Sequence, residues 1–231
     1  MWLICVELWD LFVTLYFIPL YLLNYKPYTI GSSTGLVEAI PNTHSLDALK
    51  KIPGFTTLPK YFEKTYGTSP ERLISAKRNF LSSLAAYSLF SYIMSIKDRH
   101  NGNILLDVDG HILHIDFGFI LGIAPGGAFS VETAPFKLTE EMVGVLDGGM
   151  DSALFCDFVK AFTAGFLALK AHAQNIISTV KVLALQSSYP CFYGKDQQVI
   201  IEKLRGRFRT DLNTKDTVQF CLDLIVDAYG S

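Results

Sequence analysis

Two short polar loops joined by a predicted β-hairpin constrain this chain more than any other feature. The first loop, residues 97–103, has the sequence Lys-Asp-Arg-His-Asn-Gly-Asn, and the second begins with Asp-Phe-Gly at residues 116–118. Residues 104–115, between them, contain two apolar strand-like runs around an Asp-Val-Asp-Gly turn. Because a hairpin returns the chain to the end where it started, we expect Asn103 and Asp116 to lie near one another.

The polar residues of these loops are those that phosphoryl transfer from a nucleotide requires, namely a group that positions the attacking hydroxyl and oxygen ligands for Mg²⁺. Asp98 precedes Asn103 by five positions, as the catalytic Asp precedes the metal-binding Asn in kinase loops, although here the His follows the Asp. We expect Asp98 to orient or deprotonate the hydroxyl, and His100 is the alternative base or a stabiliser of phosphate charge. Asn103 and Asp116 are expected to bind Mg²⁺, with Mn²⁺ as an alternative ion. A chance Asp-Phe-Gly after an ordinary polar turn is the competing interpretation, and the order and spacing of both motifs count against it.

The segment KDRHNGNILLDVDGHILHIDFGFILG, residues 97–122, resembles the catalytic core of the phosphatidylinositol 3- and 4-kinase superfamily. The resemblance is strongest to type III phosphatidylinositol 4-kinases, in their alpha form, and it also covers residues 79–96, 125–149 and 189–208. It implies an α+β, protein-kinase-like fold, represented mainly by the helical C-lobe with the catalytic-loop hairpin. It also implies that the chain divides into residues 1–41, a remnant of the N-lobe and hinge, and residues 42–231, the C-lobe.

The same resemblance implies a function and a nucleotide site. The function is transfer of the ATP γ-phosphate to the 4-hydroxyl of phosphatidylinositol in a membrane surface, with ATP and Mg²⁺ as cofactors. Glu38, Ala39 and Ile40 would line the adenine pocket, with Ile40 as an apolar wall; their local pattern alone predicts only a hairpin. The alternatives are a phosphatidylinositol 3-kinase, and an inactive kinase lobe that acts as an interaction module. The implied location is cytoplasmic, peripherally on the plasma membrane or on Golgi or ER membranes.

The charges of residues 116–138, called here the activation loop, indicate the substrate. After Asp116, this loop has Lys137 as its cation and Glu132 as its acid. A loop that selects a polyphosphorylated inositol is expected to carry several Lys or Arg residues to pair with the extra phosphates. Its composition therefore favours unphosphorylated phosphatidylinositol over its bisphosphate.

The N-terminal segment is strongly apolar, and residues 11–23 carry no charge. This run is shorter than the roughly 18 residues expected of a membrane span. Glu7 and Asp10 precede it, Pro19 interrupts it, and no cationic start like that of a signal peptide comes before it. We expect this segment to be buried core, and a membrane anchor is the alternative.

The parts of a kinase that cover and pair with the nucleotide phosphates are not found in the sequence. No glycine-rich loop precedes the predicted hinge, and all lysines lie at or after Lys26. The sequence therefore has the pattern of a C-terminal lobe, as expected of a fragment, an incomplete gene model or a degenerate copy. We expect the isolated 231-residue polypeptide to have little or no kinase activity.

Composition and charge set the general class. Hydrophobic residues are 50% and charged residues 18% of the chain, which is typical of a globular protein with a sizeable core. The net charge of −2 gives no bulk attraction to nucleic acid, and we expect no nucleic-acid partner. Scattered cysteines without metal-ligand spacing are expected to be reduced core thiols of a cytosolic protein: Cys5, Cys156, Cys191 and Cys221.

Capping residues and apolar periodicity predict the helices. Ser45 caps a short helix, Ser69 followed by Pro70 begins a long one, and Thr139 precedes another. The predicted helices include residues 45–51, 69–96, 155–169, 172–185, 197–208 and 215–228. A basic cluster in this region is expected to face solvent, and contact with an anionic membrane is the alternative: Lys203, Arg205, Arg207 and Arg209.

Overall fold

A computed structural model describes residues 2–31, 34–126, 133–185 and 187–231 of the chain. From the N-terminus, the helices are α1 (Trp2–Trp9), the π-helical η1 (Asp10–Leu15), α2 (Leu46–Lys50), α3 (Leu58–Tyr66), α4 (Pro70–Met94), the 3₁₀ turn η2 (Asn101–Asn103), α5 (Glu140–Val145), α6 (Ala153–Ala171), α7 (Ala173–Ala184), α8 (Gln197–Arg207) and α9 (Thr214–Ala228). The strands are β1 (Pro27–Thr29), β2 (Gly35–Val37), β3 (Thr43–Ser45), β4 (Ile104–Asp107) and β5 (Ile112–His114).

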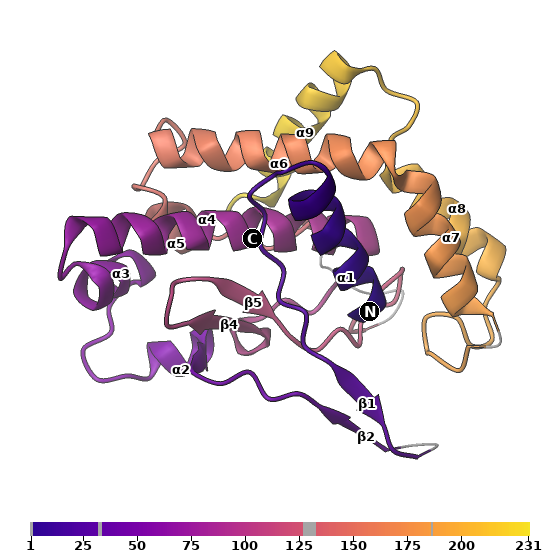
Figure 1. Cartoon of the computed structure of the whole chain (residues 1–231), viewed down its shortest axis with the longest axis horizontal. Coiled ribbons are helices and arrows are strands. Elements are labelled where there is room, and N and C mark those ends of the chain that lie inside the picture. The colour runs from indigo at the N-terminus through magenta and orange to yellow at the C-terminus, as the bar shows by residue number, and fades with distance from the viewer. Residues whose placement is uncertain (1, 32–33, 127–132, 186) are drawn as a thin grey trace.

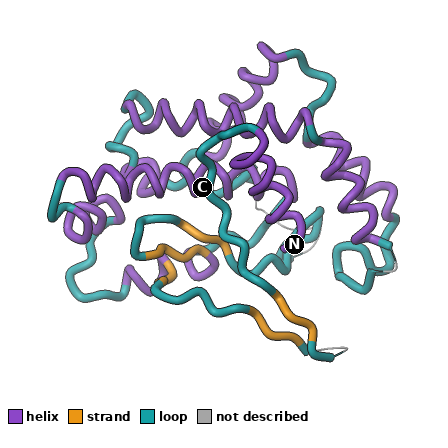
Figure 2. Tube along the Cα trace, viewed as in Figure 1, coloured by secondary structure: helices purple, strands orange, loops and turns teal. Residues whose placement is uncertain are grey.

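The architecture is α+β, as predicted, with helices in the majority. The strands gather on one side of the long helix α4, and α6 lies along its opposite side (Figure 1 and Figure 2). β1 and β2 pair as an antiparallel hairpin, and β3, β4 and β5 form a three-stranded antiparallel sheet. Within the activation loop, residues 127–132 lie outside the described residues, and the predicted acid Glu132 is one of them.

Helix α4 begins as the sequence predicts. The Ser69 hydroxyl accepts a hydrogen bond from the Arg72 amide at 3.2 Å, and Pro70 occupies the first turn. The sequence predicted one apolar face, whereas all side chains of residues 83–94 are buried. This half of the helix is covered by α6 on one side and by the β4–β5 hairpin on the other (Figure 1). α4 is therefore the central support of the loop that follows it.

Two elements between residues 42 and 66, β3 and α3, were not among the elements predicted from the sequence. α3 has ordinary start signals, since the Thr57 hydroxyl accepts from the Lys60 amide at 3.4 Å and Pro59 lies in the first turn. β3 is three residues long, too short to show a period, and it is fixed by pairing with β4. The predicted helix at Ser45 is confirmed as α2.

The N-terminal segment is buried only in part, whereas all of it was expected to be core: Leu15 and Phe17 are 56% and 85% exposed. Ile4, Leu8 and Phe12 are at most 2% exposed. These residues pack against the helices. Gly165 of α6 allows the N-terminal segment to approach closely, because a Cβ atom at residue 165 would lie 2.7 Å from the Leu20 side chain. No helix in the described part of the chain is long and apolar enough to cross a membrane.

The cysteine prediction is partly wrong. Cys191 and Cys221 are buried free thiols, and burial raises the pKa of Cys221 to about 12. Cys156, in the first turns of α6, is a free thiol but is exposed. The side chain of Cys5 lies outside the described residues.

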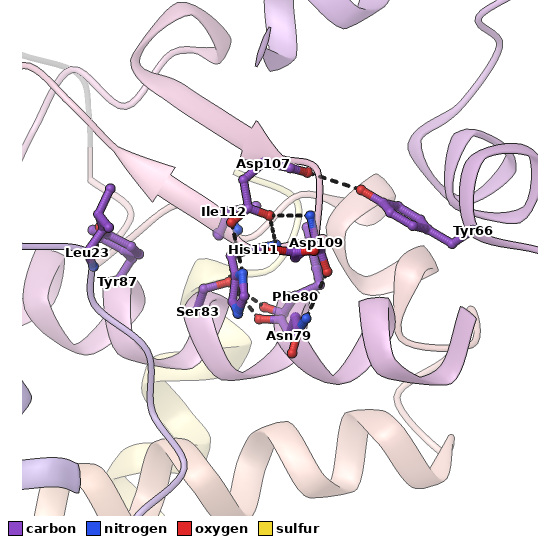
Figure 3. Close-up of polar contacts among 10 residues, drawn as sticks. All are labelled: Leu23, Tyr66, Asn79, Phe80, Ser83, Tyr87, Asp107, Asp109, His111 and Ile112. Atoms are coloured by element: carbon purple, nitrogen blue, oxygen red, sulfur yellow. Dashed lines mark hydrogen bonds and ion pairs between the residues drawn. The ribbon is translucent and has the colours of Figure 1, made fainter. Parts of the chain in front are cut away.

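The β4–β5 hairpin is held at its turn by a side-chain network (Figure 3). The Asp107 carboxylate accepts from the amides of Asp109 and His111 at 2.9 and 2.8 Å, which is typical of an Asp-initiated turn. Gly110 has φ +93°, and a Cβ there would lie 2.7 Å from the Ala76 carbonyl oxygen, so this position requires glycine. The predicted hairpin is confirmed, with Leu105 opposite Leu113.

Helices α3 and α4 anchor the same hairpin. The Ser83 hydroxyl accepts a hydrogen bond from the backbone amide of Ile112 at 2.9 Å. The side-chain amide of Asn79 donates to the backbone carbonyl of Asp109 at 2.8 Å. The Tyr66 hydroxyl donates to the Asp107 carbonyl at 3.1 Å. Figure 3 shows these bonds at the turn end of the hairpin. The other end of the hairpin carries the two polar loops, so their spacing is set by a hairpin fixed to two helices.

Asp107 makes the stability of the hairpin depend on pH. Burial raises the pKa of Asp107, but hydrogen bonds from the His111 side chain and amide lower it, and the net pKa is below its usual value. The His111 Nδ1 lies 2.9 Å from the carboxylate. A carboxylate with a lowered pKa stabilises the fold above its unfolded-state pKa, and this contribution is lost as the pH falls through the folded-state pKa.

We therefore expect Asp107→Asn to lower the free energy of unfolding by about 1–2 kcal/mol at pH 7, because charge-assisted hydrogen bonds are lost. The difference from wild type should shrink below about pH 4, where the wild-type carboxylate also becomes protonated. Urea unfolding at pH 7 and at acidic pH measures this. Asp109→Asn, in the same turn but with an exposed side chain, is the matched control. An equal loss of stability at both pH values in Asp107→Asn contradicts the pKa argument.

Candidate active site

The two polar loops lie at the same end of the β4–β5 hairpin, as predicted. The Ile115 amide donates to the Asn103 carbonyl at 3.0 Å, which joins the end of one loop to the start of the other. Asp98 and Asp116 both adopt left-handed backbone conformations, with φ of 63° and 54°. Such conformations are uncommon outside glycine, are tolerated best by Asn and Asp, and cluster at functional sites.

Within the first loop, hydrogen bonds orient the predicted polar groups. Asn103 is 7% exposed, and its side-chain nitrogen donates to the Asp98 carbonyl at 3.0 Å, which fixes the direction of its Oδ1 atom. The His100 Nδ1 atom accepts from the Gly102 amide at 3.1 Å, so a neutral His100 carries its proton on Nε2. This Nε2 atom lies 3.9 Å from the Asp98 carboxylate. The arrangement brings Asp98, His100 and Asn103 together.

Arg99 connects the two loops. It is 4% exposed, although it is charged. Its guanidinium donates to the Lys97 carbonyl at 3.1 Å, to the Ile115 carbonyl at 2.8 Å and to the Asp116 carbonyl. It also lies over the Phe117 ring, 5.6 Å from the centroid. Sequence reasoning missed this role, because Arg99 lies inside the motif but its partners follow the hairpin.

Asp116 and Phe117 are supported by helix α4. The Phe117 ring packs edge-on against Phe90 of α4, with centroids 5.5 Å apart. The Asp116 Oδ1 atom accepts from the Gly118 amide at 3.2 Å, and the residue is exposed. Just beyond, the Leu121 amide donates to the Met94 carbonyl at the end of α4 at 2.9 Å. The start of the activation loop is thus fixed on the last turn of the helix.

His114, on β5 beneath this site, is neutral. It is fully buried, and burial lowers its pKa well below the usual value, with a further contribution from the charge of Arg99. Its ring stacks on Tyr87 of α4, with centroids 4.6 Å apart. His114 is therefore a neutral, buried residue that packs on helix α4.

A pocket of about 710 Å³ joins the predicted hinge to the second loop. Glu38 and Ile40 line it on one side, and Asp116 and Phe117 line it on the other. Most of its remaining lining is apolar, as in sites that bind a flat aromatic ligand. Ala39, which was expected on this pocket, is exposed and is not part of the lining.

The predicted hinge side of this pocket is held by two hydrogen bonds between Lys26, which precedes β1, and Glu38, which follows β2. The Glu38 amide donates to the Lys26 carbonyl at 3.0 Å, and the Lys26 amide donates to the Glu38 carboxylate at 3.0 Å. A hairpin is present here as β1–β2, but residues 38–40, whose pattern predicted it, follow β2 and are not part of a strand. Its turn residues 32–33 lie outside the described residues.

Asp98, His100 and Lys137 meet on a second, smaller pocket of about 260 Å³. Its lining is completed by Arg99, Ala134, Phe136 and Ser231. Arg99 lines this smaller pocket. Its guanidinium also donates a hydrogen bond to the backbone carbonyl of Asp116, a residue that lines the larger pocket. Of the predicted site residues, Glu38, Ile40 and Asp116 line the larger pocket and Asp98, His100 and Lys137 line the smaller one, whereas Ala39 and Asn103 line neither.

Asn103 and Asp116 offer oxygen atoms that suit a Mg²⁺ ion whose other ligands would come mainly from a nucleotide. The described residues contain no group of three or more His, Cys, Asp or Glu side chains able to bind a metal. Mg²⁺ usually keeps waters and is bound by one or two side-chain oxygens together with substrate phosphates. One carboxylate and one buried amide, Asp116 and Asn103, match that donor set.

The basic cluster near the C-terminus does not form one solvated face, which corrects the prediction. Arg207 turns inward: its Nε donates to the Tyr92 carbonyl at 2.5 Å, its guanidinium lies 4.3 Å from the Tyr92 ring centroid, and burial lowers its pKa. Arg209 pairs with Asp211 at 3.1 Å, and Arg205 pairs with an acid of its own helix at 3.4 Å. These contacts do not support a cationic membrane-binding face.

Comparison with known proteins places this geometry in a family. Residues 15–192 match the family model described as phosphatidylinositol 3- and 4-kinase. The chain is 45% identical over 210 residues to a phosphatidylinositol 4-kinase of Dictyostelium discoideum, covering 90% of the chain and 18% of that protein. It is 42% identical over 212 residues to phosphatidylinositol 4-kinase beta 2 of Arabidopsis thaliana, with 90% and 19% covered, and 38% identical over 211 residues to phosphatidylinositol 4-kinase beta of Danio rerio, with 91% and 24% covered.

These relatives correct the expectation about which form of the enzyme the chain resembles. The sequence was expected to resemble the alpha form most, whereas the matched relatives that carry a form designation are beta forms. The chain spans about a fifth to a quarter of the length of these curated relatives. The family match covers most of the chain and includes both polar loops and the predicted hinge residues. The chain belongs to the phosphatidylinositol 3- and 4-kinase family.

Proposed function

We propose that this chain is the catalytic region of a phosphatidylinositol 4-kinase, which transfers the ATP γ-phosphate to the 4-hydroxyl of phosphatidylinositol. One observation carries the proposal: Asp98 and His100 lie on one pocket, Asp116 lies on the neighbouring pocket, and Arg99 connects the two. Transfer between two substrates needs two adjoining sites of this kind. The identity to proteins named phosphatidylinositol 4-kinases supports the choice of substrate.

The larger pocket is the proposed nucleotide site. Glu38 and Ile40 form its hinge wall and would contact the adenine, whereas Ala39 is not part of the lining. Asn103 and Asp116 would bind Mg²⁺, or Mn²⁺ in its place. The bound ion neutralises charge on the nucleotide phosphates. Asp116 is fixed for this role by the bond from the Gly118 amide and by the contact of Arg99 with its carbonyl.

The smaller pocket is the proposed site of the attacking hydroxyl. Asp98 is the better candidate to orient or deprotonate it, because the carboxylate is an acceptor whereas neutral His100 presents a proton on Nε2. His100 then suits a second role, donation to the phosphate oxygens as charge develops. Lys137, on the same pocket, would pair with the phosphodiester of the lipid headgroup.

The proposed fold and location follow from the same assignment. Residues 42–231 would be the C-lobe of a protein-kinase-like fold, and residues 1–41 would carry the hinge and a remnant of the N-lobe. The enzyme would act in the cytoplasm, peripherally on the membrane that holds its lipid. Phosphatidylinositol 3-kinase activity is the second candidate, because the matched family model covers both specificities.

The test uses the natural protein purified from its own cells. Any segments that the gene encodes before or after this chain are then present. Vesicles of phosphatidylcholine with phosphatidylinositol, or with phosphatidylinositol 4,5-bisphosphate, are incubated with Mg²⁺ and ATP labelled at the γ-phosphate. We expect label in phosphatidylinositol and not in the bisphosphate. Absence of label in any lipid contradicts the proposal and favours a non-catalytic module.

A further inference from the structure

The return limb of the activation loop, residues 134–138, is attached to the structure at both of its ends. At its start, the Lys97 Nζ atom donates to the Ala134 carbonyl at 3.0 Å. At its end, the Ser231 hydroxyl accepts from the Leu138 amide at 3.0 Å and donates to the Phe136 carbonyl at 3.1 Å. The partners come from two distant parts of the chain, the catalytic loop and the segment that follows α9.

The segment after α9 adds backbone bonds to the same limb. The Gly230 amide donates to the Leu138 carbonyl at 2.9 Å, and Tyr229 and Leu138 pair as a parallel bridge. Phe136 and Leu138 are buried, and the Phe136 ring packs on Phe162 of α6 with centroids 5.3 Å apart. The limb is therefore packed on the core and hydrogen-bonded to the segment after α9.

The lining of the smaller pocket shows where Lys137 lies. Lys137 lines the pocket of Asp98 and His100 together with its neighbour Phe136. Leu138, the next residue, is buried in the core. The Ser231 hydroxyl bonds to the residues immediately before and after Lys137, and Lys97 immediately precedes Asp98.

We propose that Lys97 and Ser231 are positioning residues for the lipid headgroup, which act by fixing the limb that carries Lys137. Lys97 sets the separation between the catalytic loop and the limb, and Ser231 fixes the backbone on either side of Lys137. This inference rests on the proposed function, because it takes the smaller pocket as the headgroup site. Its consequence is specificity: these two residues affect the lipid substrate and leave the nucleotide site, on the larger pocket, unchanged.

The test compares the KM values for phosphatidylinositol and for ATP among variants of the natural protein. Each variant is produced by editing the gene in its own cells. Ser231→Ala removes the hydroxyl, and Ser231→Thr retains it. Lys97→Met keeps the aliphatic stem and removes the donor. Lys60→Met, at an exposed lysine on α3, is the matched control. Hydrogen exchange of the Leu138 and Gly230 amides is measured on the same proteins.

We expect Ser231→Ala and Lys97→Met to raise the apparent KM for phosphatidylinositol about five- to tenfold, which corresponds to the loss of about one ordinary hydrogen bond. The KM for ATP should change less than about twofold. Ser231→Thr should restore the lipid KM, and Lys60→Met should match wild type. Leu138 should exchange faster in Ser231→Ala, because its amide loses its acceptor.

The outcomes separate this inference from the proposed function. An equal rise in both KM values means a general structural role and overturns the positioning role. Unchanged lipid KM in both variants, with an active wild type, overturns the positioning role alone. A wild-type protein that phosphorylates no lipid overturns the proposed function, and the positioning role with it.

Discussion

Replacing Asp116 by Asn is expected to abolish lipid phosphorylation and to leave the fold intact. Asn has the same shape, its Oδ1 atom can still accept from the Gly118 amide, and Asn tolerates the left-handed backbone that residue 116 adopts. What is lost is the negative charge that the proposed metal site supplies. Because bound metal contributes several kcal/mol to the transition state, we expect turnover to fall at least about a hundredfold.

Turnover of phosphatidylinositol and the thermal midpoint of the same protein measure this prediction together. Asp109→Asn is the matched control: it removes a carboxylate from the turn end of the same hairpin, where the side chain is exposed. We expect that control to keep wild-type turnover. Substantial turnover in Asp116→Asn, with an unchanged midpoint, contradicts a metal-binding role for Asp116.

Replacing Arg99 by Met is expected to reduce both stability and turnover. The substitution leaves the Lys97 and Ile115 carbonyls without their guanidinium donor, as well as the carbonyl of Asp116. Unsatisfied buried acceptors cost about 1–3 kcal/mol each, so we expect the free energy of unfolding to fall by about 2–3 kcal/mol after partial relaxation. Turnover should fall about a hundredfold, because the two loops lose their common support and a small misplacement of catalytic groups is costly.

Arg99→Lys separates charge from geometry. Lysine keeps the positive charge but lacks the planar fork that reaches several carbonyls at once. We expect it to recover part of the stability and little of the turnover. Urea unfolding, turnover well below the thermal midpoint and the Mg²⁺ concentration for half-maximal rate measure these effects, and that Mg²⁺ concentration should rise in both variants. Arg78→Met, at an exposed arginine of α4, is the control. Full turnover in Arg99→Met contradicts the connecting role of Arg99.

Local chemistry made much of the fold predictable. The hairpin between the polar loops follows from an Asp-initiated turn with a required glycine at 110, and the starts of α2 and α4 follow from Ser45 and Ser69. These signals involve residues within a few positions of one another, so sequence alone contains them. α3 has the same kind of signal at Thr57, so its start also follows from local chemistry.

Features that depend on distant partners were not predictable. Arg99 was visible in its motif, but its bonds to Ile115 and Asp116 exist only once the hairpin brings the loops together. Ser231 meets the activation loop across most of the C-terminal half of the chain. Arg207 was expected to face solvent, and it turns inward because Tyr92 offers both a carbonyl and a ring. In each case the tertiary contact, which has no local signature, decides the outcome.

The position of the new phosphate on the inositol ring tests the central claim most directly. The labelled lipid made by the purified protein is deacylated, and its headgroup is separated by chromatography beside inositol 3- and 4-phosphate standards prepared in the same way. We expect the label to migrate with the 4-phosphate, and to be absent from the same preparation of Asp116→Asn. Label that migrates with the 3-phosphate contradicts the assignment as a phosphatidylinositol 4-kinase.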